Sequence, residues 1–219
     1  MKYDAVNAKI KAMSAKLPDS MPMDIDALKE DAIRICRYIP DKNLRGFITQ
    51  LAAPPEKDIH YYIAQWKRLT KLDRANRHVL RGILGAEIDI TNILWMYRLK
   101  KYRRIYGNAT YGYLIPIRHR LTRAATQRMA DCETAKALRE EIAACPYAKD
   151  ISFTAQKGQS DNKESKRLTP EQQLAHAISK RCQTAAKRYP NSLAPAVSYI
   201  YCTKAYAHTG LFLMGKPKK

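Results

Sequence analysis

The stretch EIDITNILWMYRLKKYR, residues 87–103, lies in the longest helical pattern of the chain and contains its most unusual polar residues. The pattern runs from about Asp73 to Tyr106, and its apolar stripe consists of Val79, Ile83, Ala86, Ile90, Ile93, Leu94 and Tyr97. Glu87, Asp89 and Asn92 interrupt the apolar residues. An unpaired carboxylate is too costly to keep in a core. These side chains therefore face solvent or have partners on other helices.

We predict that Glu87 and Asp89 are structural and that basic side chains hold them, with Lys9, Lys11 and Arg98 as the candidates. A short repeat supports contacts between helices. Residues 4–7 (DAVN) and 89–92 (DITN) share the pattern D-x-x-N, and each is followed by a mixed apolar and basic helix. The repeat fits stacked helical units and a pseudo-symmetric fold.

The periodicity of the other segments is also helical, and no alternating strand pattern with hairpin chemistry occurs, so we expect an all-α fold. The expected segments are an N-terminal helical part (1–57), a central bundle (58–150), a linker (151–168) and a C-terminal helical part (169–219). Helices are expected over 2–17, after Asp24, from Asp131 to before Pro146, and from the capping box of Thr169 and Gln172 to Arg188.

Composition points to a basic, non-catalytic protein. The 219 residues include 40 Lys and Arg against 20 Asp and Glu, a formal charge of +20, which favours an acidic or polyanionic partner. The five cysteines are scattered without a C-x-x-C pair, and the histidines lack the spacing of a metal site. No nucleophile motif or cofactor fingerprint is present, and we predict no catalytic residue, cofactor or metal. The first residues lack the apolar run of a signal peptide.

The apolar stretch 193–215 is long enough to cross a bilayer. Lys204 and His208 lie at its middle, where charge is expensive. We therefore expect a packed, tyrosine-rich helix and no transmembrane span.

Five stretches together resemble the C subunit family of the bacterial and archaeal A/V-type rotary ATPases, whose vacuolar member is the d subunit. They are YDAVNAKIKAM (3–13), YYIAQWKRLTKL (61–72), the stretch 87–103, YGYLIPIRHRLT (111–122) and RYPNSLAPAVSYIY (188–201). The resemblance implies an all-α, funnel-like protein of related helical bundles without catalytic activity. It also implies a place on the cytoplasmic face of the membrane, peripheral to it, between the proteolipid rotor ring and the central stalk.

The resemblance carries over to individual residues. Those on the family's acidic-Asn-basic helix are Glu87, Asp89, Asn92, Arg98 and Lys100, and those on its N-terminal helix are Asn7, Lys9, Lys11 and Met13. Two departures stand out: the late stretch KAYAHTG (204–210) lacks the family's last acidic-Asn pattern, and the region 17–59 is compressed. The basic residues Arg98, Lys100, Lys101, Arg103 and Arg104 are expected to divide between internal pairs and partner contacts.

A basic helical nucleic-acid-binding protein is the alternative function. The stretches YRLKKYRR (97–104), IRHRLTR (117–123) and KPKK (216–219) offer cations for phosphates, and their neighbouring tyrosines offer rings for bases. However, the helix that carries YRLKKYRR has an ordinary buried stripe, and no known binding motif is present. The family resemblance therefore favours the rotor protein.

We predict that limited proteolysis cuts first between Ser152 and Arg167, whose few apolar residues and many turn formers cannot support a packed core. Mass spectrometry of the first fragments measures the site. First cleavage inside residues 73–106 would contradict the expected domain organisation.

Overall fold

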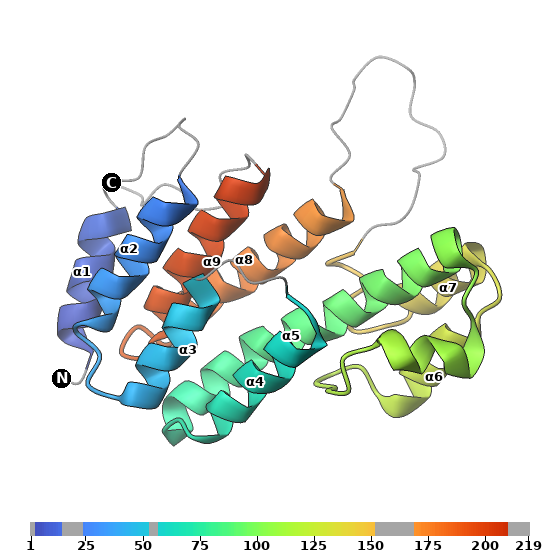
Figure 1. Cartoon of the computed structure of the whole chain (residues 1–219), viewed down its shortest axis with the longest axis horizontal. Helices are drawn as coiled ribbons and strands as arrows, with labels where there is room; N and C mark the ends of the chain where they lie inside the picture. Colours follow the sequence, from blue (N-terminus) through green and yellow to red (C-terminus); the bar gives the residue numbers. More distant parts are fainter. Residues whose placement is uncertain (1–2, 15–23, 53–56, 152–168, 210–219) are drawn as a thin grey trace, which may run out of the picture. The chain divides into compact units, whose positions relative to one another are not determined.

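The fold is entirely helical in the residues that the computed structural model describes, which are 3–14, 24–52, 57–151 and 169–209 (Figure 1). This confirms the predicted all-α class. The elements are α1 (Asp4–Ser14), α2 (Ile25–Cys36), α3 (Lys42–Ala52), α4 (Ile59–Thr70), α5 (Arg74–Arg98), the π-helical turn η1 (Leu99–Arg103), the 3₁₀ helix η2 (Gly107–Tyr113), α6 (Arg123–Asp131), α7 (Ala135–Ala143), α8 (Pro170–Arg188) and α9 (Ala194–Thr209).

The chain forms two compact units. Unit 1 contains Met1–Leu84 and Ile178–Lys219, and unit 2 contains Gly85–Ala177. The division falls inside α5 and inside α8, whereas the expected boundaries fall between helices. Apart from Ile151, the expected linker lies outside the described residues.

Local capping chemistry sets several helix ends. Asp24 caps α2 by accepting a hydrogen bond from the Asp26 amide, as its position in the sequence predicts. At α8, the Thr169 amide donates to Gln172 Oε1 at 2.8 Å and the Gln172 amide donates to Thr169 Oγ1 at 3.3 Å, which confirms the predicted capping box.

Two predicted helix ends are corrected by backbone geometry. The helix expected from Asp131 begins after Thr134, whose hydroxyl accepts from the Ala137 amide, while Asp131 ends α6. The long helix, expected to reach Tyr106, ends at Arg103 because Arg104 adopts the left-handed conformation, with φ of 54°.

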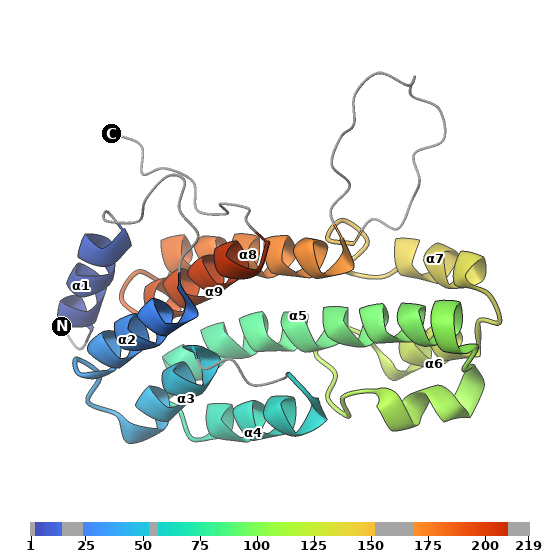
Figure 2. The same ribbon diagram turned by 45° about the horizontal axis from the view of Figure 1, so that its top comes forward.

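Helix α9 organises the core of unit 1. It packs against α1, α2 and α3, and Figures 1 and 2 both show it beside α2. Residues 196–203 of α9 are all buried, which explains an apolar composition that extends around the whole helix. Lys204 Nζ donates to the carbonyl of Leu51 at the end of α3, at 3.1 Å. No helix in the described part of the chain is long and apolar enough to span a membrane.

Tyr199, on α9, links this helix to α2. Its hydroxyl donates to Asp31 Oδ2 at 2.7 Å. Burial raises the pKa of Tyr199 above its ordinary value of 10.0, and the hydrogen bond and the charge of Asp31 raise it further. The folded state therefore favours the neutral phenol. The stabilisation of the folded state that results is present below pH 10 and is lost as the pH rises above 10.

We predict that Tyr199→Phe lowers the free energy of unfolding at neutral pH by about 1 kcal/mol, because the buried hydrogen bond is lost. Above a pH of about 10 the wild type also loses the stabilisation from its raised phenol pKa, so the difference should shrink. Urea unfolding of both proteins at neutral and alkaline pH measures it. A constant difference would contradict the linkage to Tyr199.

Candidate functional site

Asp89 occupies the centre of unit 2, on the second half of α5, and its side chain is 0% exposed. One carboxylate oxygen accepts from the amide of His119 at 3.0 Å. The other accepts from the amides of Arg120 and Leu121, at 2.7 and 2.9 Å, and from the hydroxyl of Tyr147 at 2.8 Å. These donors satisfy the buried charge and fix the backbone directly before α6.

The predicted basic partners are wrong for Asp89, because main-chain amides and a phenol hold its carboxylate. Arg98 instead forms an ion pair with Glu171 on α8, and Lys9 and Lys11 lie on α1 in unit 1. Glu87 is also buried, so the solvated-face alternative is wrong for both acids. The predicted basic partner of Glu87 stays a prediction.

Asn92, one turn after Asp89, makes a reciprocal pair of hydrogen bonds with one backbone residue. Its Nδ2 donates to the carbonyl of Ile115 at 3.0 Å, and its Oδ1 accepts from the amide of Ile115 at 2.8 Å. The side-chain amide of Asn92 thus binds both the N–H and the C=O of Ile115, as the backbone of a neighbouring β-strand would. Both residues are buried, so this pairing satisfies polar groups that water cannot reach.

Lys100, in η1, is a third anchor and is only 3% exposed. Its Nζ donates to the carbonyls of Ala130 and Cys132, at 2.7 and 2.6 Å, and lies 5.1 Å from the centre of the Tyr106 ring. A cation at these carbonyls complements the negative end of the α6 dipole. Burial lowers the pKa of Lys100, and the thiol of Cys132 and the carboxylate of Asp131 oppose this shift.

Gly85, on α5, allows the segment around His119 to approach this helix closely. A Cβ atom at Gly85 would lie 2.4 Å from Cγ of His119, closer than real Cβ atoms come to another heavy atom. His119 is the first of the residues whose amides bind Asp89. Any larger residue at position 85 would therefore displace the segment that Asp89 holds.

The sequence contains a third D-x-x-N pattern, Asp73 to Asn76, which the predicted repeat of residues 4–7 and 89–92 did not include. Asp73 caps α5 by accepting from the Asn76 amide at 3.1 Å. The buried Asn76 side chain accepts from the Leu193 amide at 2.9 Å and donates to the Tyr3 hydroxyl at 2.8 Å. Asn7 donates to the carbonyl of Pro190. In all three patterns the asparagine bonds to main chain distant in sequence.

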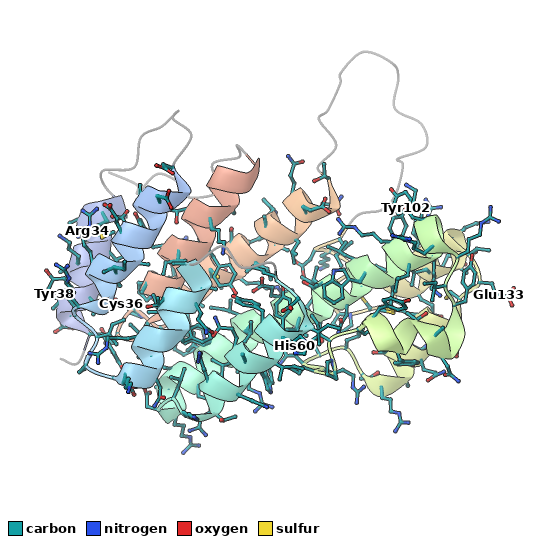
Figure 3. All side chains as sticks on the ribbon, in the orientation of Figure 1. Arg34, Cys36, Tyr38, His60, Tyr102 and Glu133 are labelled. Carbon is teal, nitrogen blue, oxygen red and sulfur yellow. The ribbon has the colours of Figure 1, made fainter. Side chains whose placement is uncertain are left out.

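The basic cluster after Arg98 divides into internal and exposed residues. Lys101, Arg103 and Arg104 are exposed, whereas Lys100 is internal. Lys101 Nζ lies 5.1 Å from the ring centre of Tyr102. Tyr102 is 67% exposed and lies at the outer edge of the ribbon in Figure 3. A role for the exposed residues in partner contacts stays a prediction.

The described residues include no metal-binding cluster, since no three His, Cys, Asp or Glu side chains could jointly hold an ion. None of the five cysteines, all of which lie in the described residues, forms a disulfide, and burial raises the pKa of the thiols of Cys36, Cys132, Cys145 and Cys202. A raised pKa keeps a thiol protonated and makes it a poor nucleophile.

We predict that Asp89→Ala lowers the free energy of unfolding by about 3 kcal/mol, because three backbone amides and the Tyr147 hydroxyl would lose the buried carboxylate to which they donate. Thermal and urea unfolding measure the change. Glu133→Ala is the control, since Glu133 is exposed, and it should alter stability by at most about 0.5 kcal/mol. Equal stability of the two variants would show that the Asp89 carboxylate does not anchor residues 119–121.

Comparison with known proteins gives one match. A sequence model of the family described as ATP synthase (C/AC39) subunit matches residues 57–205, which include α5 and η1 with the three anchors Asp89, Asn92 and Lys100. No curated protein and no solved structure matches the chain significantly. Helices α1 to α3 lie outside the matched range, whereas four of the five stretches that carried the resemblance lie within it. The match covers more than half of the chain, which therefore belongs to the ATP synthase (C/AC39) subunit family.

Proposed function

We propose that this subunit of a V/A-type ATPase couples the central stalk to the membrane proteolipid ring without chemistry of its own. Family membership is the observation that carries the proposal. The proposed position is peripheral, on the cytoplasmic face of the membrane, with stalk subunits on one side and the loops of the ring on the other. The pseudo-symmetric, funnel-like arrangement implied by the family resemblance belongs to the same proposal.

The anchors on α5 and η1 support a mechanical role. A part that passes torque must resist deformation, and buried polar networks with every member satisfied are rigid. Asp89, Asn92 and Lys100 together hold the main chain at residues 115, 119–121, 130 and 132. Displacing these residues would leave several buried donors and acceptors without hydrogen-bond partners at once.

Exposed cations support an electrostatic grip on the partner. Lys101, Arg103 and Arg104 follow one another closely at the end of the anchored helix, so a partner bound there would contact the rigid part of unit 2. Attraction between these cations and an acidic surface would speed association and favour one orientation. Salt would weaken such a grip.

Nucleic-acid binding is the second candidate, because the exposed ring of Tyr102 lies among the same cations. An exposed aromatic ring with neighbouring Lys and Arg can stack on a base while the cations bind phosphates. This function would require tight binding of DNA or RNA at physiological salt by the purified chain. It would also leave the chain independent of ATPase subunits.

Removing this subunit from the ATPase complex should leave ATP hydrolysis by the soluble sector intact while ion pumping stops. Reversing three charges, with Lys101→Glu, Arg103→Glu and Arg104→Glu, should weaken co-purification with the other subunits most strongly at low salt, where these charges are least screened. Assays of hydrolysis, of ion uptake into vesicles and of co-purification measure these outcomes.

The control for the triple variant reverses three other exposed charges of unit 2, at Arg118, Arg123 and Lys136. It should co-purify as the wild type does. Pumping that continues without the subunit would contradict the coupling role. Tight binding of RNA or DNA by a chain that co-purifies with no ATPase subunit would establish the nucleic-acid alternative.

A further inference from the structure

A basic pocket lies in unit 1, where the first turns of α5 meet the connection between α8 and α9. Its volume is 640 Å³, and its polar lining residues are Arg74, Arg77, His78, Arg81, Tyr189 and Ser192. The four residues from α5 are spaced at i, i+3, i+4 and i+7, so they share one face of the helix. The Leu193 amide, bonded to Asn76, fixes the connection beside this face.

The arginines of this pocket are not neutralised by carboxylates of the described residues. Arg77 donates to the carbonyl of Leu72 at 2.6 Å, and the guanidinium of Arg81 lies 5.1 Å from the centre of a Trp66 ring. Within the part of the chain that the structure describes, neither they nor Arg74 form an ion pair. Asp73, the adjacent acid, is bonded to Asn76 and Tyr3 instead.

The connection between α8 and α9 adds the aromatic ring of Tyr189 to the lining, and several contacts hold this ring in place. Tyr189 meets the ring of His78 edge to face, with centroids 6.3 Å apart, and the guanidinium of Arg188 lies 5.6 Å from the Tyr189 ring centre. The Ser192 hydroxyl donates to the Tyr189 carbonyl at 2.7 Å. The pocket is thus a shaped hollow with a concentrated positive charge.

We propose that this pocket binds a compact ligand that carries two or more phosphate groups. Guanidinium groups bind phosphate oxygens through paired hydrogen bonds, and three of them here lack a carboxylate partner among the described residues. A single phosphate would leave part of this charge unneutralised. The volume lies within the range of about 300–1,000 Å³ that is usual for small-ligand sites. A hollow also suits a compact polyphosphate better than an extended nucleic-acid backbone.

Titration calorimetry with sodium tripolyphosphate at physiological salt tests the site in the full chain. The wild type should show saturable binding of one ligand per chain. Arg74→Ala should weaken it by about tenfold, the usual contribution of a charge-assisted hydrogen bond. Arg74 is exposed and makes no hydrogen bond or ion pair with a described residue, so this variant should fold normally, which circular dichroism checks.

Two further variants separate local chemistry from total charge. Lys136→Ala removes one exposed charge from unit 2 and should leave tripolyphosphate binding unchanged. Arg74→Lys keeps the charge without the planar guanidinium and should bind with intermediate strength. Absence of saturable binding, or equal weakening by Arg74→Ala and Lys136→Ala, would overturn the proposal. Because the isolated chain is used, the result is independent of the proposed rotor function.

Vesicles distinguish a lipid headgroup from a soluble source of the phosphates. Phosphatidylcholine vesicles containing phosphatidylinositol bisphosphate are compared with vesicles of equal surface charge containing phosphatidylserine. Preference for the bisphosphate lipid, lost in Arg74→Ala, would identify a lipid ligand for the pocket. Binding of tripolyphosphate without that preference would identify a soluble one.

Discussion

The Asp89 carboxylate and the amides of residues 119–121 form the interaction on which unit 2 depends. A buried carboxylate is tolerated only when hydrogen bonds replace the water that it loses. Here three consecutive backbone amides and the Tyr147 hydroxyl do so, which fixes both the backbone before α6 and the turn after α7. Gly85 is required because the segment comes too close to α5 for a Cβ atom there. Charge, backbone and helix packing therefore constrain one another at this point.

Asn92 and Lys100 extend the same arrangement along the helix. Asn92 binds the backbone of Ile115, a few residues before the amides that Asp89 binds. Lys100 binds the carbonyls of Ala130 and Cys132 at the end of α6. The segment from Ile115 to Cys132 is thus held at three places by α5 and the turn η1 that follows it. The proposed coupling function needs such a part, because torque can pass only through a body that keeps its shape.

Several of the many basic side chains donate hydrogen bonds to main-chain carbonyls. Lys100, Lys204 and Arg77 donate to carbonyls at the ends of α6, α3 and α4 or in the turns that follow, and Arg45 donates to the carbonyl of Ile39. Carbonyls left free at a helix end are natural acceptors for cations. Such bonds place the side chain without cancelling its charge. The fold therefore keeps a positive charge that remains available to anionic partners.

Local sequence was sufficient for features that depend on neighbouring residues. The caps at Asp24 and Thr169, the long apolar stripe of α5 and the apolar character of α9 all predicted the observed helices, because each follows from contacts within a few residues. The family could also be identified from five short stretches, and the family model confirms it.

Only tertiary structure decided which groups hold the buried acid. The donors to Asp89 are mostly backbone amides, which every residue except proline carries, so no side-chain pattern marks positions 119–121. Asp73 and Asn76 showed a readable D-x-x-N pattern, but the partner of Asn76 at Leu193 could not be deduced from it. Likewise, the continuous periodicity of α5 concealed the unit boundary at Gly85. Helical periodicity records which face of a helix is buried, but the main-chain groups that meet that face are chosen by the packing of distant segments.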